Sequence, residues 1–314
     1  MIGTPEAFAR ATIGREGGRG AAWIAELPSI VGELLGTWKC DRDGEVLHGG
    51  VGVIVPVRRE DGTAAVLKVS FPHPGNVHEP DAFAAWGGRG AVLLHERDDA
   101  RFAMLLERAS AGTLADLSDE DEILRVAGRL SRRLAVPAPA GLPRLRDRAD
   151  EWEEALRADA AEFPGALPRS VVAEAAATAR DLGAVQPDTV VHGDLHARNI
   201  LPATREPWLA VDPKGCAGDP AYDAGTLLKT RALALLTAPD LTAAVLRAVD
   251  VYAEAAELDR ERVRRWAQFH AVQAAYWGRR HGFRRARGGT ERDGLVAYAD
   301  ALATLLTGGR RAAP

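Results

Sequence analysis

The N-terminal third of the chain alternates short apolar runs with turn residues. The runs are rich in β-branched residues, and Glu60-Asp61-Gly62 between two of them is typical of a hairpin turn. This pattern predicts an antiparallel meander. The expected strands are 44–48, 53–58, 64–70, 91–94 and 102–107, and the expected helices are 20–36, broken near Pro28, and 79–86.

The rest of the chain is mainly helical in its spacing of apolar residues. Helical periodicity covers residues 119–183 and most of the chain after 220, and Asp219-Pro220 is typical of a helix N-cap followed by the first helical residue. Short strands are expected at 189–191, 199–201 and 208–211. The whole pattern predicts an α+β protein with a small β-rich part, residues 1–108, and a larger helical part, residues 109–314.

Composition narrows the class of protein. The chain has 314 residues with 46% hydrophobic and 27% charged residues, which are globular values. A net charge of −4 argues against a nucleic-acid binder, and two cysteines cannot form a disulfide framework or a four-cysteine zinc site. No run of eighteen apolar residues and no apolar signal core is present, so we expect a cytoplasmic protein without membrane contact, and a monomer by default.

Two residue types are scarce. Of the 40 basic residues only four are lysines, and the chain has two asparagines, Asn76 and Asn199. In a chain so biased towards arginine, a retained lysine or asparagine is a candidate for a chemical role. The lysines are Lys39, Lys68, Lys214 and Lys229.

The segment VVHGDLHARNIL carries the clearest chemistry. Asp194 and Asn199 lie five residues apart across a predicted loop, and Asp212 ends a predicted strand thirteen residues later. Phosphoryl transfer needs a carboxylate that orients the attacking hydroxyl, oxygen ligands for Mg²⁺ and a cation for the phosphates. The sequence offers a candidate for each need: Asp194 for the carboxylate, Asn199 with Asp212 for the metal ligands, and Lys68 for the cation. The structural alternatives are a turn aspartate for Asp194, a turn asparagine for Asn199 and a strand-ending aspartate for Asp212.

HGDLHARN followed by VDPKG resembles the catalytic and metal-binding segments of the aminoglycoside phosphotransferase family, which has the protein-kinase-like fold. The stretches AWGGRGAVLL, MLLERASAGTLADL and REPWLAVDPKGCAGDPAYDAGTLL are similar to its streptomycin 6-kinase and hydroxyurea phosphotransferase branch. The resemblance implies a two-lobed fold, ATP and Mg²⁺ as cofactors, and a nucleotide and a small molecule as the binding partners.

The resemblance also implies roles for individual residues in catalysis. Asp194 would be the catalytic base or hydroxyl-orienting carboxylate, and His192 would help to hold its loop. Asn199 and Asp212 would bind Mg²⁺, with Pro213 in place of the phenylalanine that follows the kinase aspartate.

For the nucleotide, the resemblance implies that Lys68 binds the α- and β-phosphates and pairs with Glu79. Because Pro80 follows Glu79, that residue must sit at the start of its helix or be displaced. Glycines of the HGGVG segment would cover the phosphates, although this segment lacks the full G-x-G-x-x-G pattern. Backbone groups near Glu107 and Ala109 would bind adenine. The glycines concerned are Gly49, Gly50 and Gly52.

The acceptor is less well defined. A polycationic acceptor needs an acidic pocket, for which Asp219 and Asp223 are candidates, and Asp219 is equally a helix cap. The streptomycin 6-hydroxyl is the acceptor that the resemblance favours, and hydroxyurea or another small metabolite is the alternative. Two other classes are a metallophosphoesterase, because Gly193-Asp194-Leu195-His196 has the Gly-Asp-x-His pattern, and a pseudokinase.

Overall fold

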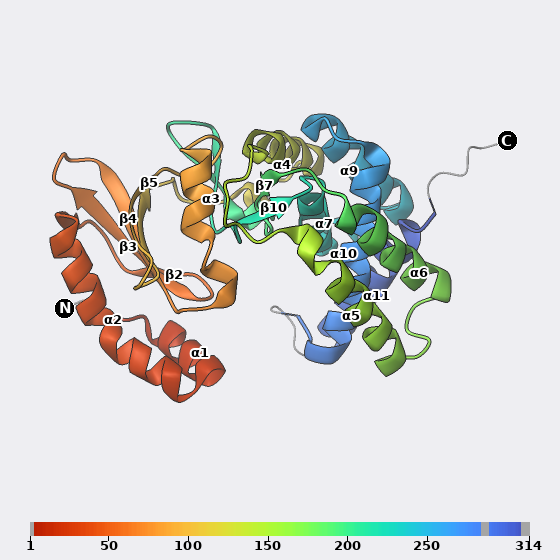
Figure 1. Cartoon of the computed structure of the whole chain (residues 1–314), viewed down its shortest axis with the longest axis horizontal. Coiled ribbons are helices and arrows are strands. Elements are labelled where there is room, and N and C mark those ends of the chain that lie inside the picture. The colour runs from red at the N-terminus through yellow and green to blue at the C-terminus, as the bar shows by residue number, and fades with distance from the viewer. Residues whose placement is uncertain (1–2, 284–288, 309–314) are drawn as a thin grey trace. The chain divides into compact units, whose positions relative to one another are not determined.

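The computed structural model of the protein describes residues 3–283 and 289–308 (Figure 1). Its contacts divide the chain into two compact units. Unit 1 contains the residues up to Ala111 together with Pro202–Lys214, and unit 2 contains Gly112–Leu201 and the residues from Gly215 onwards. The division into domains 1–108 and 109–314 stays a prediction. A single boundary at residue 108 does not capture the membership of Pro202–Lys214 in unit 1.

Unit 1 is built on an antiparallel sheet of six strands in the order β1-β3-β4-β6-β5, with β2 paired to β3. Its elements are α1 (Glu6–Glu16), α2 (Gly18–Thr37), β1 (Cys40–Arg42), β2 (Leu47–His48), β3 (Gly52–Arg59), β4 (Ala64–Ser70), the 3₁₀ turn η1 (Pro74–Asn76), α3 (Glu79–Trp86), β5 (Leu94–Asp98), β6 (Ala103–Glu107) and β9 (Trp208–Ala210).

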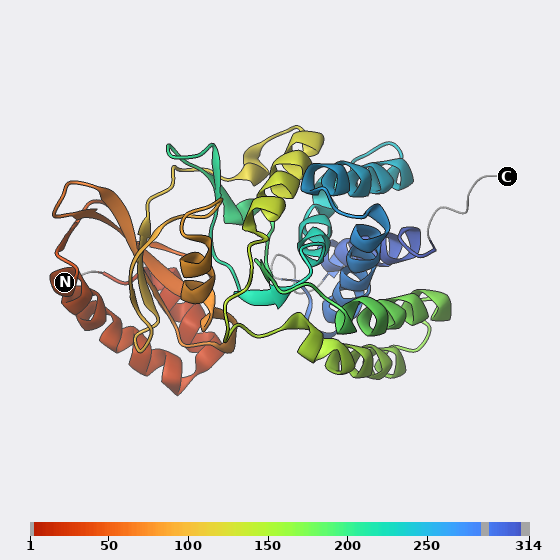
Figure 2. The same cartoon turned by 45° about the horizontal axis from the view of Figure 1, so that its top comes forward.

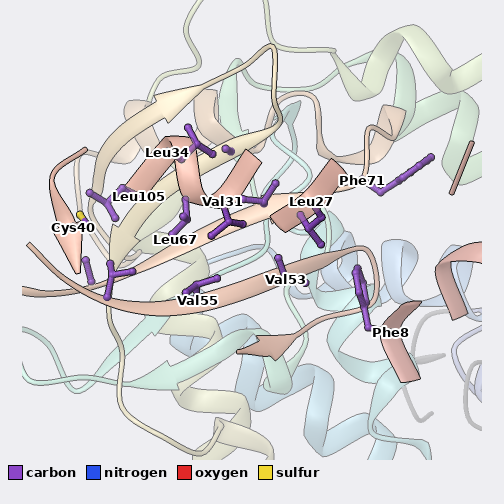
Figure 3. Close-up of a cluster of buried hydrophobic side chains, with 14 of the residues drawn as sticks. Phe8, Leu27, Val31, Leu34, Cys40, Val53, Val55, Leu67, Phe71 and Leu105 are labelled. Carbon is purple, nitrogen blue, oxygen red and sulfur yellow. The ribbon is translucent and has the colours of Figure 1, made fainter. Parts of the chain in front are cut away.

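One face of this sheet forms the core of unit 1. Side chains alternate between the two faces of a strand, so Leu67 points to one face and Lys68 to the other. Leu67 packs with the buried face of α2, including Leu27 and Val31, and with Val55 of β3 (Figure 3). The alternation therefore directs Lys68 away from the apolar core, to the face on which its ionic partners lie.

Two local predictions for unit 1 were wrong, and one helix was not predicted. Helix α2 continues through Pro28, and α1 was not expected at all. The buried residues Leu27 and Val31 hold the helix against the sheet, and this packing outweighs the missing proline N–H. The strand expected at 91–94 is instead β5 (Leu94–Asp98), whose largely polar residues gave no strand signal.

Unit 2 is mainly helical, and α10 lies at its centre, where it contacts α6, α7, α9 and α11 (Figure 2). In the described part of the chain, no helix is both long and apolar enough to cross a bilayer. The helices of unit 2 are α4 (Glu120–Leu134), α5 (Ala149–Glu162), α6 (Arg169–Thr178), α7 (Tyr222–Thr230), α8 (Ala232–Leu235), α9 (Leu241–Ala256), α10 (Arg260–His281) and α11 (Gly289–Leu305).

Short strands and turns complete unit 2. β7 (Thr189–Val191) lies where it was predicted and pairs with β10 (Cys216–Gly218), which was not predicted. The predicted helix start at Asp219 was wrong, because α7 begins at Tyr222 with Ala221 as its N-cap. The remaining elements are η2 (Leu114–Asp116), η3 (Leu145–Arg148), the π-helical turn η4 (Ala179–Gly183), η5 (Ala197–Asn199) and β8 (Ile200–Pro202), at whose end the chain enters unit 1.

Helices α7 and α10 approach closely at Gly225. A Cβ atom at this position would overlap the ring of His270 and lie 2.8 Å from the His270 Cβ. Because His270 is 3% exposed and packs edge-on against Tyr222, it has little room to move. We therefore expect Gly225→Ala to lower the free energy of unfolding by about 1–3 kcal/mol, as measured by urea denaturation.

Gly32→Ala is the matched control, because Gly32 is also helical and has nothing within 4 Å of the position that a Cβ atom would occupy. Alanine is the better helix former there, so this control should raise the free energy of unfolding by about 0.5–1 kcal/mol. Equal effects of the two substitutions would contradict the close packing of α7 on α10.

Candidate active site

Lys68 of β4 is the buried cation of unit 1. Its Nζ lies 2.5 Å from Glu79 Oε1 and also pairs with Asp212 Oδ1. Burial alone would lower the pKa of Lys68, but the two carboxylates outweigh burial and raise that pKa above its usual range. The lysine is therefore held as an ammonium, which is the form that binds phosphate.

Glu79 reaches Lys68 because α3 begins at Glu79. Pro80 then lies in the first turn of the helix, where a missing N–H interrupts no hydrogen bond. Pro80 allowed Glu79 either to begin the helix or to be displaced from it. The structure shows Glu79 at the start of the helix, where it pairs with Lys68. Glu79 is 2% exposed, so its charge depends on Lys68.

Asp212 follows β9 and belongs to unit 1. Its backbone adopts φ 63°, in the left-handed region that aspartate tolerates better than most residues. Its side chain is 47% exposed. Exposure leaves this carboxylate open to a further ligand, as a metal-binding role would need.

The glycine-rich segment forms the turn between β2 and β3. Gly49 N donates to Gly52 O at 2.9 Å. Gly52 pairs with Ser70, and a Cβ at Gly52 would lie 2.8 Å from Ser70 Oγ, so β3 and β4 need a glycine here. Gly50 O accepts from Arg15 at 3.1 Å. A phosphate-covering role for Gly49, Gly50 and Gly52 stays a prediction.

Glu107 ends β6, and its groups are used inside unit 1. Its N–H donates to Leu93 O at 2.8 Å, and its carboxylate accepts from Arg205 at 2.8 and 3.1 Å. Arg205 also donates to Gly88 O and Ala91 O, both at 2.7 Å. Sequence reasoning missed Arg205, since nothing in the pattern of residues marks one arginine among 36. Adenine binding by backbone groups near Glu107 and Ala109 stays a prediction.

Asp194 stands on a tight loop of unit 2 after β7. Gly193 has φ 78°, and Asp194 N donates to His192 Nδ1 at 3.2 Å. His192 is buried, and the bond to Nδ1 ties its ring to the loop, while a catalytic role for His192 stays a prediction. The Asp194 side chain is 33% exposed and therefore reachable by a substrate.

Asn199 closes the same loop from η5. Its Nδ2 donates to Asp194 O at 3.0 Å. The amide nitrogen is thus committed to the loop, and the amide oxygen, which is the atom that Mg²⁺ binds, lies outside this hydrogen bond. In the described ranges, no cluster of three or more His, Cys, Asp or Glu side chains has the geometry of a metal site.

Asp223, in the first turn of α7, anchors the loop. Its carboxylate accepts from His192 N at 3.0 Å and from Gly193 N at 2.8 Å. Burial raises the pKa of Asp223 to about 7, while these two backbone N–H groups oppose the rise. The sequence made Asp223 one candidate for contact with the substrate, and the structure gives this carboxylate hydrogen-bond partners within the protein.

Asp219 is likewise buried, with 1% exposure. It accepts from Trp266 Nε1 at 2.6 Å and from Ala221 N at 3.0 Å, and it pairs with Arg262. The carboxylates of Asp219 and Asp223 thus have their hydrogen-bond partners within the protein and need no contact with an acceptor. Contact of Asp219 or Asp223 with the acceptor stays a prediction and finds no support in their positions.

The residues predicted to bind phosphate therefore lie together in unit 1, and the residues predicted to orient the acceptor hydroxyl lie together in unit 2. Unit 1 holds Lys68 charged between Glu79 and Asp212. Unit 2 presents Asp194 on a loop fixed by His192, Asn199 and Asp223. A carboxylate held in place and partly exposed can orient and deprotonate a hydroxyl, and a buried ammonium can bind phosphate.

Comparison with known proteins supports this chemistry. The chain is 37% identical over 279 residues to the streptomycin 6-kinase of Streptomyces glaucescens, covering 88% of this chain and 91% of that protein. It is 36% identical over 265 residues to the hydroxyurea phosphotransferase of Kitasatospora aureofaciens, covering 83% and 76%.

The fold has solved counterparts. The crystal structure of a macrolide 2′-phosphotransferase from Brachybacterium faecium matches with a TM-score of 0.54 at 18% identity, over 91% of this chain and 99% of that one. The predicted kinase-like α+β fold is thus confirmed. The family described as "Aminoglycoside/hydroxyurea antibiotic resistance kinase" matches residues 37–282. The chain belongs to this family of kinases.

Proposed function

We propose that the protein transfers the γ-phosphoryl group of ATP to a hydroxyl of streptomycin, at the 6-position. The observation that carries the proposal is the fixed, partly exposed Asp194 in a chain that is 37% identical to streptomycin 6-kinases over 88% of its length. Family membership implies ATP as the phosphoryl donor.

In the proposed reaction, the acceptor oxygen forms a bond to the γ-phosphorus while the bond from that phosphorus to the β-bridging oxygen breaks. The proton of the hydroxyl passes to the Asp194 carboxylate, and ADP leaves. His192, Asn199 and Asp223 hold the backbone around Asp194, so the carboxylate needs little reorganisation during the reaction.

We assign the nucleotide to Lys68, whose ammonium binds the α- and β-phosphates, and Glu79 keeps that ammonium in place. The Gly49–Gly52 turn covers the phosphates, and backbone groups near Glu107 and Ala109 bind adenine. Asn199 and Asp212 would hold Mg²⁺ through the amide oxygen and the carboxylate, which are the hard oxygen ligands that this ion prefers. When bound, Mg²⁺ neutralises charge on the phosphates.

The second candidate acceptor is hydroxyurea, favoured by the relative from Kitasatospora aureofaciens. The two acceptors differ in charge and size: streptomycin is a large polycation, and hydroxyurea is small and neutral. A single enzyme therefore has little reason to use both equally well.

ADP release by the purified protein, with Mg²⁺ and ATP, tests the proposal against streptomycin, hydroxyurea, kanamycin and glucose. We expect release that depends on streptomycin and a much lower rate with each of the other compounds. Release with hydroxyurea alone would move the assignment to the second candidate. Release without any acceptor dependence would contradict a kinase for small molecules.

A further inference from the structure

Arg205 has no part in the reaction described above, yet three sequence stretches that resemble the streptomycin 6-kinase and hydroxyurea phosphotransferase branch meet at its side chain. The turn after α3 lies in AWGGRGAVLL, the end of β6 lies in MLLERASAGTLADL, and the third stretch begins with Arg205 itself. The residues that Arg205 contacts in these stretches all belong to unit 1, as does Arg205. Its role can therefore be argued within that unit.

The guanidinium of Arg205 binds two separate segments of unit 1 at once. Its Nη2 donates to Glu107 Oε2 at 2.8 Å, and its Nε lies 3.1 Å from both oxygens of that carboxylate. Its Nη1 donates to Gly88 O and its Nη2 to Ala91 O, both at 2.7 Å. A planar guanidinium with five N–H donors can make these bonds together, whereas the single nitrogen of a lysine cannot.

The turn after α3 brings its backbone close to Arg205. Gly87, Gly88 and Gly90 have φ values of 54°, 82° and 70°, in the left-handed region that favours glycine. A Cβ atom at Gly88 would lie 2.5 Å from Leu93 Cδ2 and 3.5 Å from Arg205 Nη1. The glycines thus shape a turn whose carbonyl oxygens the guanidinium can reach.

Strand β9 is joined to the same turn through its backbone. Ala210 N donates to Gly90 O at 2.9 Å, and Val92 N donates to Ala210 O at 3.2 Å. Arg205 lies three residues before β9, and Asp212 lies two residues after it. The bonds of Arg205 therefore fasten one end of this short ladder, and Asp212 stands just beyond the other end.

The two segments that Arg205 fastens together carry the two carboxylates beside Lys68. Glu79 begins α3, and the helix ends at the turn that contains Gly88. Asp212 follows β9, and both carboxylates pair with Lys68. A shift of β9 relative to this turn would change the position of Asp212 about the ammonium.

We propose that Arg205 is a positioning residue for the phosphate and Mg²⁺ site of unit 1. By holding β9 against the turn after α3, it sets where Asp212 stands relative to Lys68 and Glu79. The proposal rests on the proposed functions of Lys68 and Asp212. Arg205 acts through the backbone of β9 and contacts neither the nucleotide nor the metal.

Three variants separate this role from charge and from general support. Arg205→Met removes every bond of the guanidinium, and Arg205→Lys keeps a positive charge near Glu107 but cannot reach both carbonyl oxygens. Arg58→Met is the matched control. Arg58 also belongs to unit 1, donates to a carboxylate, that of Asp43, at 2.8 Å, and donates to a backbone carbonyl, Gly62 O, at 2.9 Å.

Hydrogen exchange in the protein without nucleotide or metal tests the first step. The amide hydrogens of Val92 and Ala210 close the ladder between β9 and the turn. They should exchange about 10-fold faster, or more, in Arg205→Met and Arg205→Lys, and at the wild-type rate in Arg58→Met. Unchanged exchange in Arg205→Met would overturn the proposal, because β9 would then hold its place without the guanidinium.

Calorimetric binding of ATP in the presence of Mg²⁺ tests the second step, at a temperature at which every variant is folded. The Kd should rise by about 10- to 100-fold in Arg205→Met, the range found when a residue that orients a metal ligand is removed. Arg205→Lys should not restore the wild-type Kd, and Arg58→Met should keep it within twofold. A lower melting temperature of Arg205→Met with an unchanged Kd would overturn the proposal, as would full rescue by lysine.

Failure of the proposed function looks different. If the wild-type protein binds no ATP with Mg²⁺, the roles assigned to Lys68 and Asp212 are wrong, and hydrogen exchange still decides whether Arg205 holds β9. If streptomycin is not the acceptor, neither measurement changes, because neither contains an acceptor.

Discussion

Asp194→Asn is expected to lower kcat for streptomycin by about 10²- to 10⁴-fold, the range associated with general acid–base groups. Asparagine keeps the shape of the side chain but cannot accept the proton of the attacking hydroxyl. The loop should keep its structure, because its hydrogen bonds use the Asp194 backbone and the side chains of His192, Asn199 and Asp223. Steady-state ADP release measures the effect.

The matched control is Asp147→Asn, because Asp147 is also an aspartate of unit 2 and its side chain is 70% exposed. This control should leave kcat within twofold of the wild-type value. Both variants should unfold at the wild-type temperature. If Asp194→Asn kept a tenth or more of the wild-type kcat, another group would have to orient the hydroxyl.

Lys68→Met is expected to have the largest effect on stability. It leaves Glu79, at 2% exposure, as a buried carboxylate without its paired cation. Breaking a buried pair in this way costs about 3–5 kcal/mol, which urea denaturation measures. The variant should also lose turnover, because the ammonium proposed for the phosphates is gone.

The double variant Lys68→Met/Glu79→Gln separates the two effects. It removes the orphaned charge, so it should regain most of the lost stability while turnover stays absent. Lys39→Met, which breaks an exposed pair, should cost less than about 1 kcal/mol. Recovery of turnover in the double variant would contradict a role for Lys68 in phosphate binding.

Several candidate site residues could be singled out from the sequence because phosphoryl transfer restricts residue type and spacing, and their roles stay predictions. Asp194 and Asn199 fall in one short loop, and Lys68 lies in a strand whose apolar neighbours indicate burial. For such residues, local sequence and the demands of phosphoryl transfer point to the same positions. The pairing with Glu79 was predictable only as one of two outcomes, because the position of Pro80 in the helix decides between them.

Other features depend on contacts between residues far apart in the sequence. Asp223 was singled out as an acid, but its role follows from hydrogen bonds to His192 and Gly193, about thirty residues earlier. Arg205 reaches Glu107 across 98 residues. Propensity and spacing carry no information about such partners. Packing likewise explains why α2 passes through Pro28 against the local signal.

Analysis of the reaction product tests the central claim most directly. The protein is incubated with ATP, Mg²⁺ and streptomycin, and the products are identified by mass spectrometry and by NMR of the modified sugar. The account predicts one phosphate ester per ADP released, located on the 6-hydroxyl of streptomycin, and none with Asp194→Asn. Unmodified streptomycin together with ADP and free inorganic phosphate would contradict it.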